Sequence, residues 1–517
     1  MGPKAARVVV ANSDSDEEED PEENVSQDEI EEVEAEQEAL RRGRTVKISL
    51  SLKRGEKCKV CGSSAHRAGF QGATYIDCPN KPCYLCKVPG HTTATCPHRL
   101  DPGRDCRPST DQNKEGIISL LAKRERDGKV RGVELPKTEW KVDCAILRLH
   151  HRRCQCLRFH PTKDDIVVSG DKSGELAVWN FMDVNERTVY SRHHKANTNG
   201  IRFIRDGDGM TCLTSSSDGT LKSIDIEVGK GDELLNLNEG DVQFWGKHWL
   251  QMVGIDIDHE KSLAVVGDSS GGLHFVDHRV PGELYNHRIH KNRVTSCDFN
   301  PRDNGVLLTC GNDHTAKILD IRKLGSEDGS WKEVTVLHHP RVVNNALFSP
   351  LTGRKIMTTC LDNRIRLWDD ISRWDCDPDR EIIHSHDFNR YLTPFQATWD
   401  PKDLLENQMM CGRYISENFN GVALHPVDMF DASNGRHLAE MVDPMLSTIS
   451  PLSLFHPRLD YVVSGSSRAL YMWCPKSEAD KEEEEMASKK AKKDPMSKEA
   501  LYRFFDAGVD NKKGKKK

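Results

Sequence analysis

The chain contains 517 residues, of which 36% are hydrophobic, 6% aromatic and 30% charged. That length exceeds one ordinary domain, and no run approaches the roughly 18 apolar residues that a membrane-spanning helix needs. The N-terminus shows neither the apolar core nor the cleavage pattern of a secretory signal, so a membrane-embedded or secreted protein is not expected.

The formal charge of −7 is unevenly distributed along the chain. Fifteen Asp or Glu residues and no Lys or Arg lie between Asp14 and Glu38, and the rest of the chain carries 74 basic against 66 acidic residues, or +8. Acid-rich sequence of low hydrophobicity cannot bury enough surface to fold. Residues 1–57 are therefore predicted to be a disordered segment, acidic and then basic, and the acidic part and the net-basic remainder of the chain are expected to meet different partners.

A Cys/His-rich block follows, and residues 58–98 are predicted to be a zinc-knuckle region of the CCHC type. Seven of the 17 cysteines fall between Cys58 and Cys106. Two thiolates separated by two residues can bind one side of a tetrahedral ion, and a closed set of four such ligands favours a structural Zn²⁺. The second half has the complete knuckle spacing, C-x2-C-x4-H-x4-C, with ligands Cys83, Cys86, His91 and Cys96.

The first half of the block is a less regular set: Cys58, Cys61, His66 and, after an eleven-residue gap, Cys78. It is predicted to be a second knuckle with a stretched last loop. Two alternatives are that Cys78 only supports the fold or that Cys106 supplies the fourth ligand. Knuckles commonly bind single-stranded nucleic acid through aromatic and basic side chains, here Tyr84, Lys87 and Arg99, whereas the other interpretation is a protein-docking module.

Residues 99–150 form a polar linker in which residues 116–123 could make one short amphipathic helix. Residues 151–474 then repeat seven times, each copy combining an apolar strand, a turn, a β-branched strand, a Gly/Ser/Asp turn and a further strand. A unit of several short strands that recurs along the chain is typical of WD-repeat propellers, in which blades bury one another's faces. An all-β, seven-bladed propeller is predicted, with two stacked β domains as the alternative and residues 475–517 as a charged, lysine-rich tail.

The sequence contains no motif that indicates catalysis. A P-loop, a G-x-S-x-G elbow and an H-E-x-x-H pair are all missing from it. His160, His425 and His456 each precede a proline in a blade turn, where a histidine is expected to hold the turn together. The protein is therefore not expected to be an enzyme.

Basic residues recur just before the first strand of a blade or in its turns. If equivalent positions fall on the same end of the ring, they form a cationic platform for phosphates, although each one singly could be scattered surface charge. These residues are Arg152, Arg153, Lys172, Lys195, Lys291 and Arg293.

The sixth repeat carries an insertion, residues 384–394, whose tip consists of Phe388, Asn389, Arg390 and Tyr391. Apolar wedges pushed between base steps kink duplex DNA, and damaged bases cost least to extrude. The insertion is therefore predicted to probe weakened base pairs; the alternative is packing against a neighbouring blade.

Several of these motifs resemble the DNA damage-binding protein 2 family, the propeller subunits of the UV-damaged DNA-binding complex. The resemblance covers residues 152–473 and rests on RFHPTKDDIVVSGDKSGELAVWNF, HKNRVTSCDFNP, TAKILDIR and NRYLTPFQATWDP followed by GRY. The Cys/His block ahead of the propeller is similar to the plant form of this family.

The resemblance implies that one face of the propeller holds damaged duplex, such as UV photodimers, and that a hairpin with its tip at Phe388–Tyr391 enters the minor groove. The tip has one residue more than animal members, so the wedge is Phe388, Tyr391 or both. Phosphate contacts map onto Arg152, Lys172 and Arg293, a flanking aromatic onto Tyr285, and the Gly-Arg-Tyr motif adds Arg413.

The resemblance also implies that the other face docks to the propeller adaptor of a cullin-RING ubiquitin ligase. The adaptor-binding signature maps onto residues 307–322, with Asp320 and Arg322 kept and Leu319 in place of a tryptophan. The helix expected at 116–123 would correspond to an adaptor-docking helix.

The sequence thus predicts a nuclear, non-catalytic lesion sensor that recruits ubiquitin-ligase machinery in nucleotide excision repair, with Zn²⁺ as its cofactor and histones as a further candidate partner. Two alternatives are an RNA-processing factor, with the knuckles on RNA, and a histone-binding scaffold, with the acidic N-terminus on basic tails.

Overall fold

The computed structural model describes residues 137–482 except for short gaps, residue 135, and a few positions nearer the N-terminus. The gaps are at 192, 206–208, 240–245, 247, 325–332, 372–375, 387–392, 415–424, 445, 447 and 481. Nearer the N-terminus the structure describes Cys83, Val88, His91 and Cys96, and the strands β1 (Arg7–Val10), β2 (Gly69–Gln71) and β3 (Thr74–Ile76).

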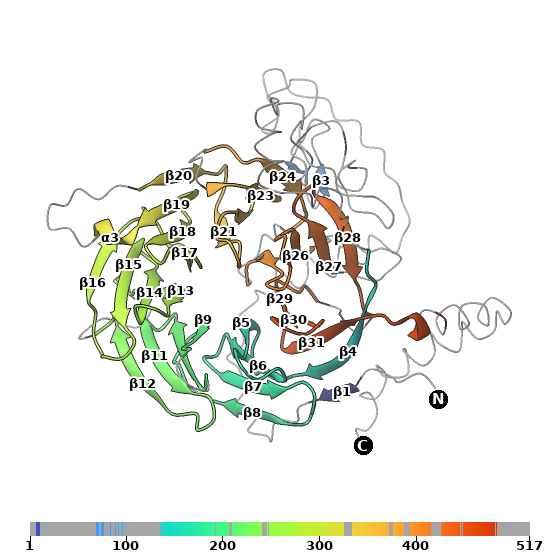
Figure 1. Cartoon of the computed structure of the whole chain (residues 1–517), viewed down its shortest axis with the longest axis horizontal. Helices are drawn as coiled ribbons and strands as arrows, with labels where there is room; N and C mark the ends of the chain where they lie inside the picture. Colours follow the sequence, from blue (N-terminus) through green and yellow to red (C-terminus); the bar gives the residue numbers. More distant parts are fainter. Residues whose placement is uncertain are drawn as a thin grey trace.

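Seven antiparallel sheets surround a central axis, so the predicted seven-bladed propeller is confirmed (Figure 1). Each predicted repeat supplies the first three strands of one blade. Blades one to three contain β5 (Cys154–Phe159), β6 (Ile166–Asp171), β7 (Leu176–Asn180) and β8 (Arg187–Tyr190); β9 (Thr198–Phe203), β10 (Thr211–Ser216), β11 (Thr220–Asp225) and β12 (Gly231–Asn236); and β13 (Met252–Asp258), β14 (Leu263–Asp268), β15 (Gly272–Asp277) and β16 (Tyr285–Arg288).

The remaining blades follow in chain order. Blades four to six contain β17 (Val294–Phe299), β18 (Val306–Gly311), β19 (Thr315–Asp320) and β20 (Thr335–His338); β21 (Val343–Phe348), β22 (Ile356–Cys360), β23 (Arg364–Trp368) and β24 (Arg380–Ile383); and β25 (Thr398–Trp399), β26 (Gln408–Gly412), β27 (Val427–Asp431) and β28 (Arg436–Met441). Blade seven contains β29 (Leu452–Phe455), β30 (Val462–Ser466), β31 (Ala469–Pro475) and β4 (Trp140–Leu147), and α3 (Ile321–Leu324) follows β19.

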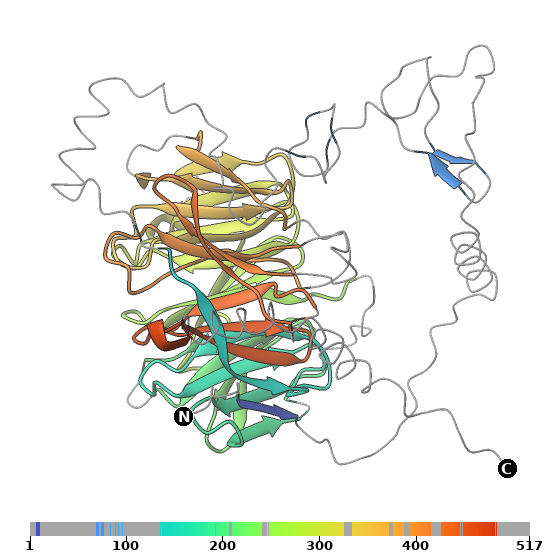
Figure 2. The same cartoon turned by 90° about the vertical axis from the view of Figure 1, so that its right-hand side faces the viewer.

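Blade seven closes the ring by pairing the two ends of the propeller. The N-terminal strand β4 runs antiparallel to the C-terminal strand β31, with Trp473 opposite Val142, and Figure 2 shows the sheets of the ring from the side. The propeller therefore begins at Trp140, ahead of the predicted boundary at 151. β1 extends this blade by one parallel strand, with Val10 opposite Leu147.

The blades adhere through apolar faces. Between blades seven and one, for example, Val463 and Met472 pack in one buried cluster with Val167 and Trp179. Each such side chain contributes about 1.5–3 kcal/mol on full burial, and only closure of the ring buries both faces of every sheet. Within the described part of the chain, no helix has the length and apolar character needed to cross a membrane.

Short strands β2 and β3 form a hairpin in the Cys/His block, with Phe70 opposite Tyr75 in the backbone register. This hairpin lies in the eleven-residue interval between His66 and Cys78, where the sequence predicted a stretched loop. Residues 116–123 and the lysine-rich tail after residue 482 lie outside the described residues.

Candidate nucleic-acid interface

One backbone hydrogen bond recurs from blade to blade and defines equivalent positions at one end of the ring. It joins the loop before the first strand to the turn between the second and third strands: Lys172 N donates to Arg153 O at 2.9 Å, and Asn312 N donates to Arg293 O at 2.8 Å. Blades two, three and five repeat it. The basic positions that the sequence singled out in these loops and turns therefore share one end of the propeller, here called the basic end.

Carboxylates in the turns fix the backbone beneath three of the basic side chains. Arg152 N donates to Asp171 Oδ2 at 3.1 Å, and Lys195 N donates to Asp218 Oδ2 at 2.8 Å. Lys291 N makes the same bond to Asp313 at 3.1 Å. The side chains of Arg152, Lys172, Lys195 and Lys291 are exposed. Because the turns hold the main chain, these side chains stand on a rigid platform.

Buried histidines hold these turns in place. His290 contacts Asp313 at 3.0 Å through Nδ1 and Thr309 Oγ1 at 2.9 Å through Nε2. Burial raises the pKa of Asp313, but the hydrogen bond and the charge of His290 lower it. The net effect is a pKa below the ordinary value. An ionised carboxylate is a strong acceptor for the Lys291 amide, so the turn keeps its shape at neutral pH.

Two of the predicted contacts are less accessible than the others. Arg293 is half-buried, and burial lowers the pKa of its guanidinium. Tyr285 stacks on Phe275 with ring centroids 4.6 Å apart. Tyr285 is the first residue of β16. The last residue of this strand, Arg288, lies opposite Gly272 at the basic end. Three strand residues, about 10 Å, therefore separate Tyr285 from that end. The structure therefore does not bring Tyr285 together with the exposed cations.

Arg413 lies inside blade six, with only 4% of its surface exposed. Its Nε is 3.3 Å from Asp428 Oδ2, and its Nη2 pairs with Glu440. Asp428 also accepts hydrogen bonds from His384 Nε2 at 3.1 Å and His437 Nε2 at 3.0 Å. The guanidinium is thus engaged within the blade, and a direct contact of Arg413 with DNA stays a prediction.

Asp428 is the centre of this network and is completely buried. Burial alone would raise the pKa of its carboxyl group, but the Arg413 charge and the two imidazole hydrogen bonds outweigh burial and hold the pKa well below its ordinary value. The network lies directly below the insertion of the sixth repeat, since His384 follows the last residue of β24.

The tip of that insertion, residues 387–392, lies outside the described residues, but both of its ends are fixed at the basic end. His386 Nε2 donates to Cys360 O at 2.8 Å in blade five. Thr393 Oγ1 donates to Cys154 O at 3.1 Å in blade one, directly after Arg152 and Arg153. The wedge roles of Phe388, Asn389, Arg390 and Tyr391 stay predictions.

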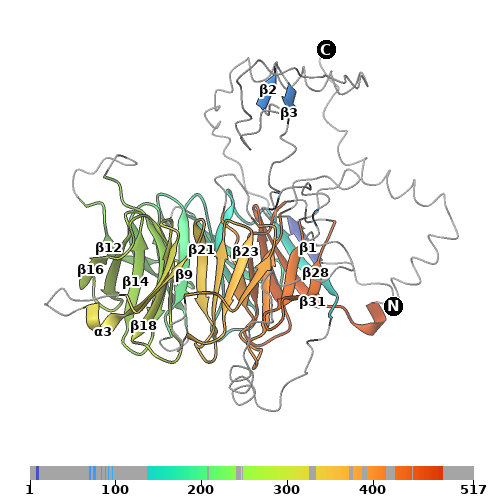
Figure 3. The same cartoon turned by 90° about the horizontal axis from the view of Figure 1, so that it is seen from above.

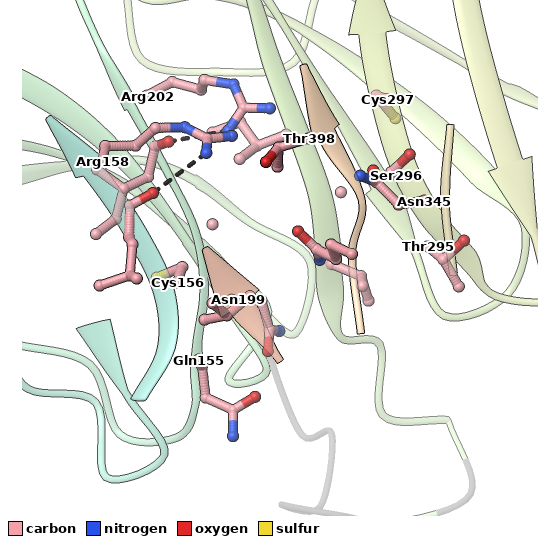
Figure 4. A pocket seen from close by; sticks show the side chains of 18 of the residues that line it. Gln155, Cys156, Arg158, Asn199, Arg202, Thr295, Ser296, Cys297, Asn345 and Thr398 are labelled. Carbon is pink, nitrogen blue, oxygen red and sulfur yellow. Dashed lines mark hydrogen bonds between the residues drawn. The ribbon is translucent and has the colours of Figure 1, made fainter. Parts of the chain in front are cut away.

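The central channel offers too little free volume for nucleic acid; Figure 4 shows side chains that line it. It is lined by the innermost strands of all seven blades and has a cavity volume of about 80 Å³, room for only a few waters. Arg158 and Arg202 project into it, and Arg202 Nε donates to Asp256 at 2.7 Å. Burial, with repulsion from Arg202, lowers the pKa of Arg158 to about 9. Duplex can therefore meet the propeller only on an end or on the outer rim.

A groove on the rim, between blades seven and one, adds three arginines that sequence reasoning missed. Its volume is about 610 Å³, and its lining includes Arg148, Arg187 and Arg468. None of these guanidinium groups forms an ion pair with a described residue. No motif marks these arginines, because they come from the linker, an outer strand and a turn, but the groove continues toward His151 and the basic end.

Asp320 and Arg322 lie at the opposite end of blade four. Asp320 pairs with Val306 at the far end of the sheet from Gly311, which pairs with Val294 beside Arg293. Figure 3 shows the adjoining helix α3 at the lower end of the ring. Arg322 Nε donates to Asp320 Oδ1 at 2.8 Å; this bond first of all lowers the pKa of Asp320. The pair is exposed at Arg322 and available to a protein partner.

In the Cys/His block, the described ligands of the second knuckle converge. Cys83, His91 and Cys96 have their ligand atoms within 4.8 Å of one another, and both cysteines are buried. Cys83 N donates to Val88 O at 2.9 Å, which closes the turn between the ligands. These positions fit a tetrahedral metal; Cys86 and the first set, Cys58, Cys61, His66 and Cys78, lie outside the described residues. Cys83 and Cys96 also cluster with Ile383 of β24.

The three histidines that precede prolines have structural surroundings. His160 Nδ1 accepts a hydrogen bond from Lys163 N at 2.9 Å, and His456 Nδ1 accepts one from Leu459 N at 2.7 Å. His425 stacks on Tyr414, with ring centroids 5.9 Å apart. The hydrogen bonds of His160 and His456 agree with the turn-holding role that the sequence predicted, whereas the contact given for His425 is a ring stack.

Comparison with known proteins gives consistent results. The profile of the family described as "WD domain, G-beta repeat" matches residues 282–320. The chain is 46% identical to DNA damage-binding protein 2 of Oryza sativa subsp. japonica, over 86% of this chain and 76% of the relative. It is 44% identical to Protein DAMAGED DNA-BINDING 2 of Arabidopsis thaliana, over 83% and 76%, and 30% identical to DNA damage-binding protein 2 of Bos taurus, over 63% and 72%.

Proposed function

Because the chain belongs to the DNA damage-binding protein 2 family, we propose that it recognises lesions in duplex DNA on the basic end of its propeller. The observation that carries this proposal is the sharing of one end by the exposed Arg152, Lys172, Lys195 and Lys291 and by both anchors of the insertion. Cations on a rigid surface release counterions from the phosphate backbone and supply affinity for any sequence.

Discrimination would come from the insertion rather than from the cations. Residues 388–391 enter the duplex as a wedge, and a lesion that has already weakened stacking lowers the cost of extruding a base. The hydrogen bonds of His386 to Cys360 O and of Thr393 to Cys154 O hold the base of this wedge between blades five and one. A fixed base is required because the wedge must resist the force that restacks the bases.

The opposite end would dock the propeller adaptor of a cullin-RING ubiquitin ligase, with Asp320 and Arg322 in the contact. The two ends are separated by the length of a blade, so DNA and adaptor bind at the same time. In this proposal the protein is a nuclear, non-catalytic receptor in nucleotide excision repair. Zn²⁺ bound by Cys83, Cys86, His91 and Cys96, and by the first set of ligands, would supply structural stability to the block ahead of the propeller.

The test is a competition between intact and UV-irradiated duplex at fixed salt, since affinities without a salt concentration cannot be compared. Arg152→Glu should weaken binding of both duplexes by the same factor, whereas Arg354→Glu, an exposed arginine on the turn between β21 and β22, should change neither. Replacing residues 388–391 by Gly and Ser should remove the preference for irradiated duplex. Equal loss on both duplexes after the loop replacement would contradict the wedge.

A second candidate function, binding of single-stranded RNA, is favoured by the convergence of Cys83, His91 and Cys96, because knuckles take unpaired bases. The same competition includes a single-stranded RNA arm. Tight RNA binding together with no preference for irradiated duplex would favour this second function over the first.

A further inference from the structure

A second group of metal-ligand side chains lies at the junction of blades five and six, apart from the Cys/His block. His384 and His386 follow β24, and Cys411 belongs to β26. All three are buried, and their ligand atoms lie within 4.8 Å of one another. The two imidazole rings face each other through their Nδ1 atoms, which are 3.1 Å apart.

The outer nitrogen of each ring is already assigned as a hydrogen-bond donor. His384 Nε2 lies 3.1 Å from Asp428 Oδ2, and His386 Nε2 lies 2.8 Å from the carbonyl oxygen of Cys360. Both oxygens can only accept, so both Nε2 atoms must carry hydrogen. A neutral imidazole has a single N–H, and consequently each Nδ1 presents a lone pair to the other. Two lone pairs at this distance repel unless a cation lies between them.

The surroundings supply the charge and the support that such a cation requires. Asp428 and Glu440 place two carboxylates against the one guanidinium of Arg413, so a single further positive charge, at the two rings or at His437 on the other oxygen of Asp428, balances the cluster. Histidines that bind a metal usually donate their other N–H to a carboxylate or a backbone carbonyl, and these two do one of each.

We propose that His384 Nδ1, His386 Nδ1 and the Cys411 thiolate bind a zinc ion that fastens blade five to blade six. Zn–N bonds of about 2.0–2.1 Å in a tetrahedron place two nitrogens roughly 3.4 Å apart, close to the observed separation. Two imidazoles and one thiolate suit zinc and not magnesium or calcium, which prefer oxygen ligands. On binding, the Cys411 thiol releases its proton to solvent.

The ion would lie at the base of residues 387–392, and its value for DNA recognition rests on the function proposed above. It would hold the segment that follows β24, through His384 and His386, against β26, through Cys411. The third ligand, Cys411, favours this arrangement over the alternative occupant, a proton shared between the two rings, because the ion would engage a thiol that lies 3.6 Å from Gly412 O, a long contact.

The test counts zinc in the full-length chain after chelation, reloading with Zn²⁺ and dialysis. Cys411→Ala should hold one zinc equivalent fewer than the wild type by mass spectrometry of the metal. Cys212→Ala is the matched control, because it removes an equally buried thiol from the corresponding strand of blade two and should keep every equivalent. Ions in the knuckles are common to all three proteins and cancel in the comparison.

A second measurement uses Co²⁺, with Cys411→Val as a further variant that fills the volume of the thiol. The spectrum of the cobalt-loaded wild type minus that of either variant should show the visible bands of a tetrahedral site with one thiolate. Equal metal content in wild type and Cys411→Ala, or a flat difference spectrum, would overturn the site and leave the shared proton as the explanation. Either result leaves the preference for irradiated duplex to be decided by its own assay.

Discussion

Substituting Asp428 by asparagine is expected to destabilise blade six strongly. The side chain is 0% exposed and faces Arg413, His384 and His437. Asparagine keeps the shape but removes the negative charge, and so removes one of the two carboxylates, Asp428 and Glu440, that face the buried Arg413. Breaking a buried ion pair by removing one partner costs about 3–5 kcal/mol, and one hydrogen bond to a charged group is worth about 1.5–3 kcal/mol. We therefore expect a loss of about 3 kcal/mol in the free energy of unfolding.

Urea denaturation at pH 7.5 measures this loss, and Glu440→Gln is the matched control. Both changes replace a carboxylate by its amide opposite the same guanidinium, but the Glu440 side chain is 26% exposed. A partly solvated pair is worth about 1 kcal/mol or less, so the control should lose far less. Equal midpoints for Asp428→Asn and Glu440→Gln would refute the argument that burial makes Asp428 the anchor.

The pH dependence of this difference follows from the direction of the Asp428 shift. The pKa of its carboxyl group is held below its ordinary value in the folded protein, chiefly by Arg413 once the opposing effect of burial is overcome. Its contribution is therefore fully present above the ordinary value of about 4 and is lost as the pH falls through the folded pKa. The part of the stability gap between wild type and Asp428→Asn that comes from this carboxylate, about 3 kcal/mol at pH 7.5, should narrow in acid below the ordinary value.

Three further outcomes are expected. Lys195→Ala should reduce the slope of log K against log salt by about 0.9 on intact and irradiated duplex alike, measured by fluorescence anisotropy; an unchanged slope would remove Lys195 from the phosphate contacts. Ile383→Asp should lower the preference for irradiated duplex while the zinc content stays constant, because Ile383 packs on Cys83 and Cys96 and so joins the knuckle to the base of the insertion; a loss of zinc instead would show that the substitution disturbs a zinc site rather than this junction. Arg322→Ala should weaken capture of the ligase adaptor in a pull-down and leave DNA affinity unchanged, and a drop in DNA affinity would contradict the separation of the two ends.

The blades could be predicted because each repeat carries its own strand alternation and turn residues. β5, β6 and β7, for example, follow one another in a single stretch, and their pairing is local. The sequence placed the start of the propeller at residue 151, after β4. The reason is that β4 pairs with β31, the last strand of the propeller, and the sequence near Trp140 does not indicate that partner. Period and turns fix neighbours in sequence, whereas ring closure is decided by a long-range contact.

Some candidate site residues could be placed from the sequence and others could not, and the difference again depends on whether a local pattern determines the position. Lys172 and Lys195 could be placed because a turn position in a regular repeat determines its end of the ring. Arg413 and Tyr285 were chosen from motifs, and a motif does not say where the side chain points: one guanidinium turns inward to Asp428, and one ring stacks on Phe275. The arginines of the rim groove escaped because they gather from segments with no common pattern.

Buried charge below the insertion has a physical rationale if the insertion acts as the proposed wedge. A wedge that opens base pairs is pushed back by the stacking it disrupts, so the work is transmitted to its base. Apolar packing resists compression but has no preferred angle, whereas the hydrogen bonds of His386 to Cys360 O and of His384 to Asp428 are directional. Such networks fix a single geometry when every member is satisfied. Weakening the centre of this network should therefore reduce discrimination between intact and irradiated duplex before it reduces affinity, because the cations of the basic end lie on other blades.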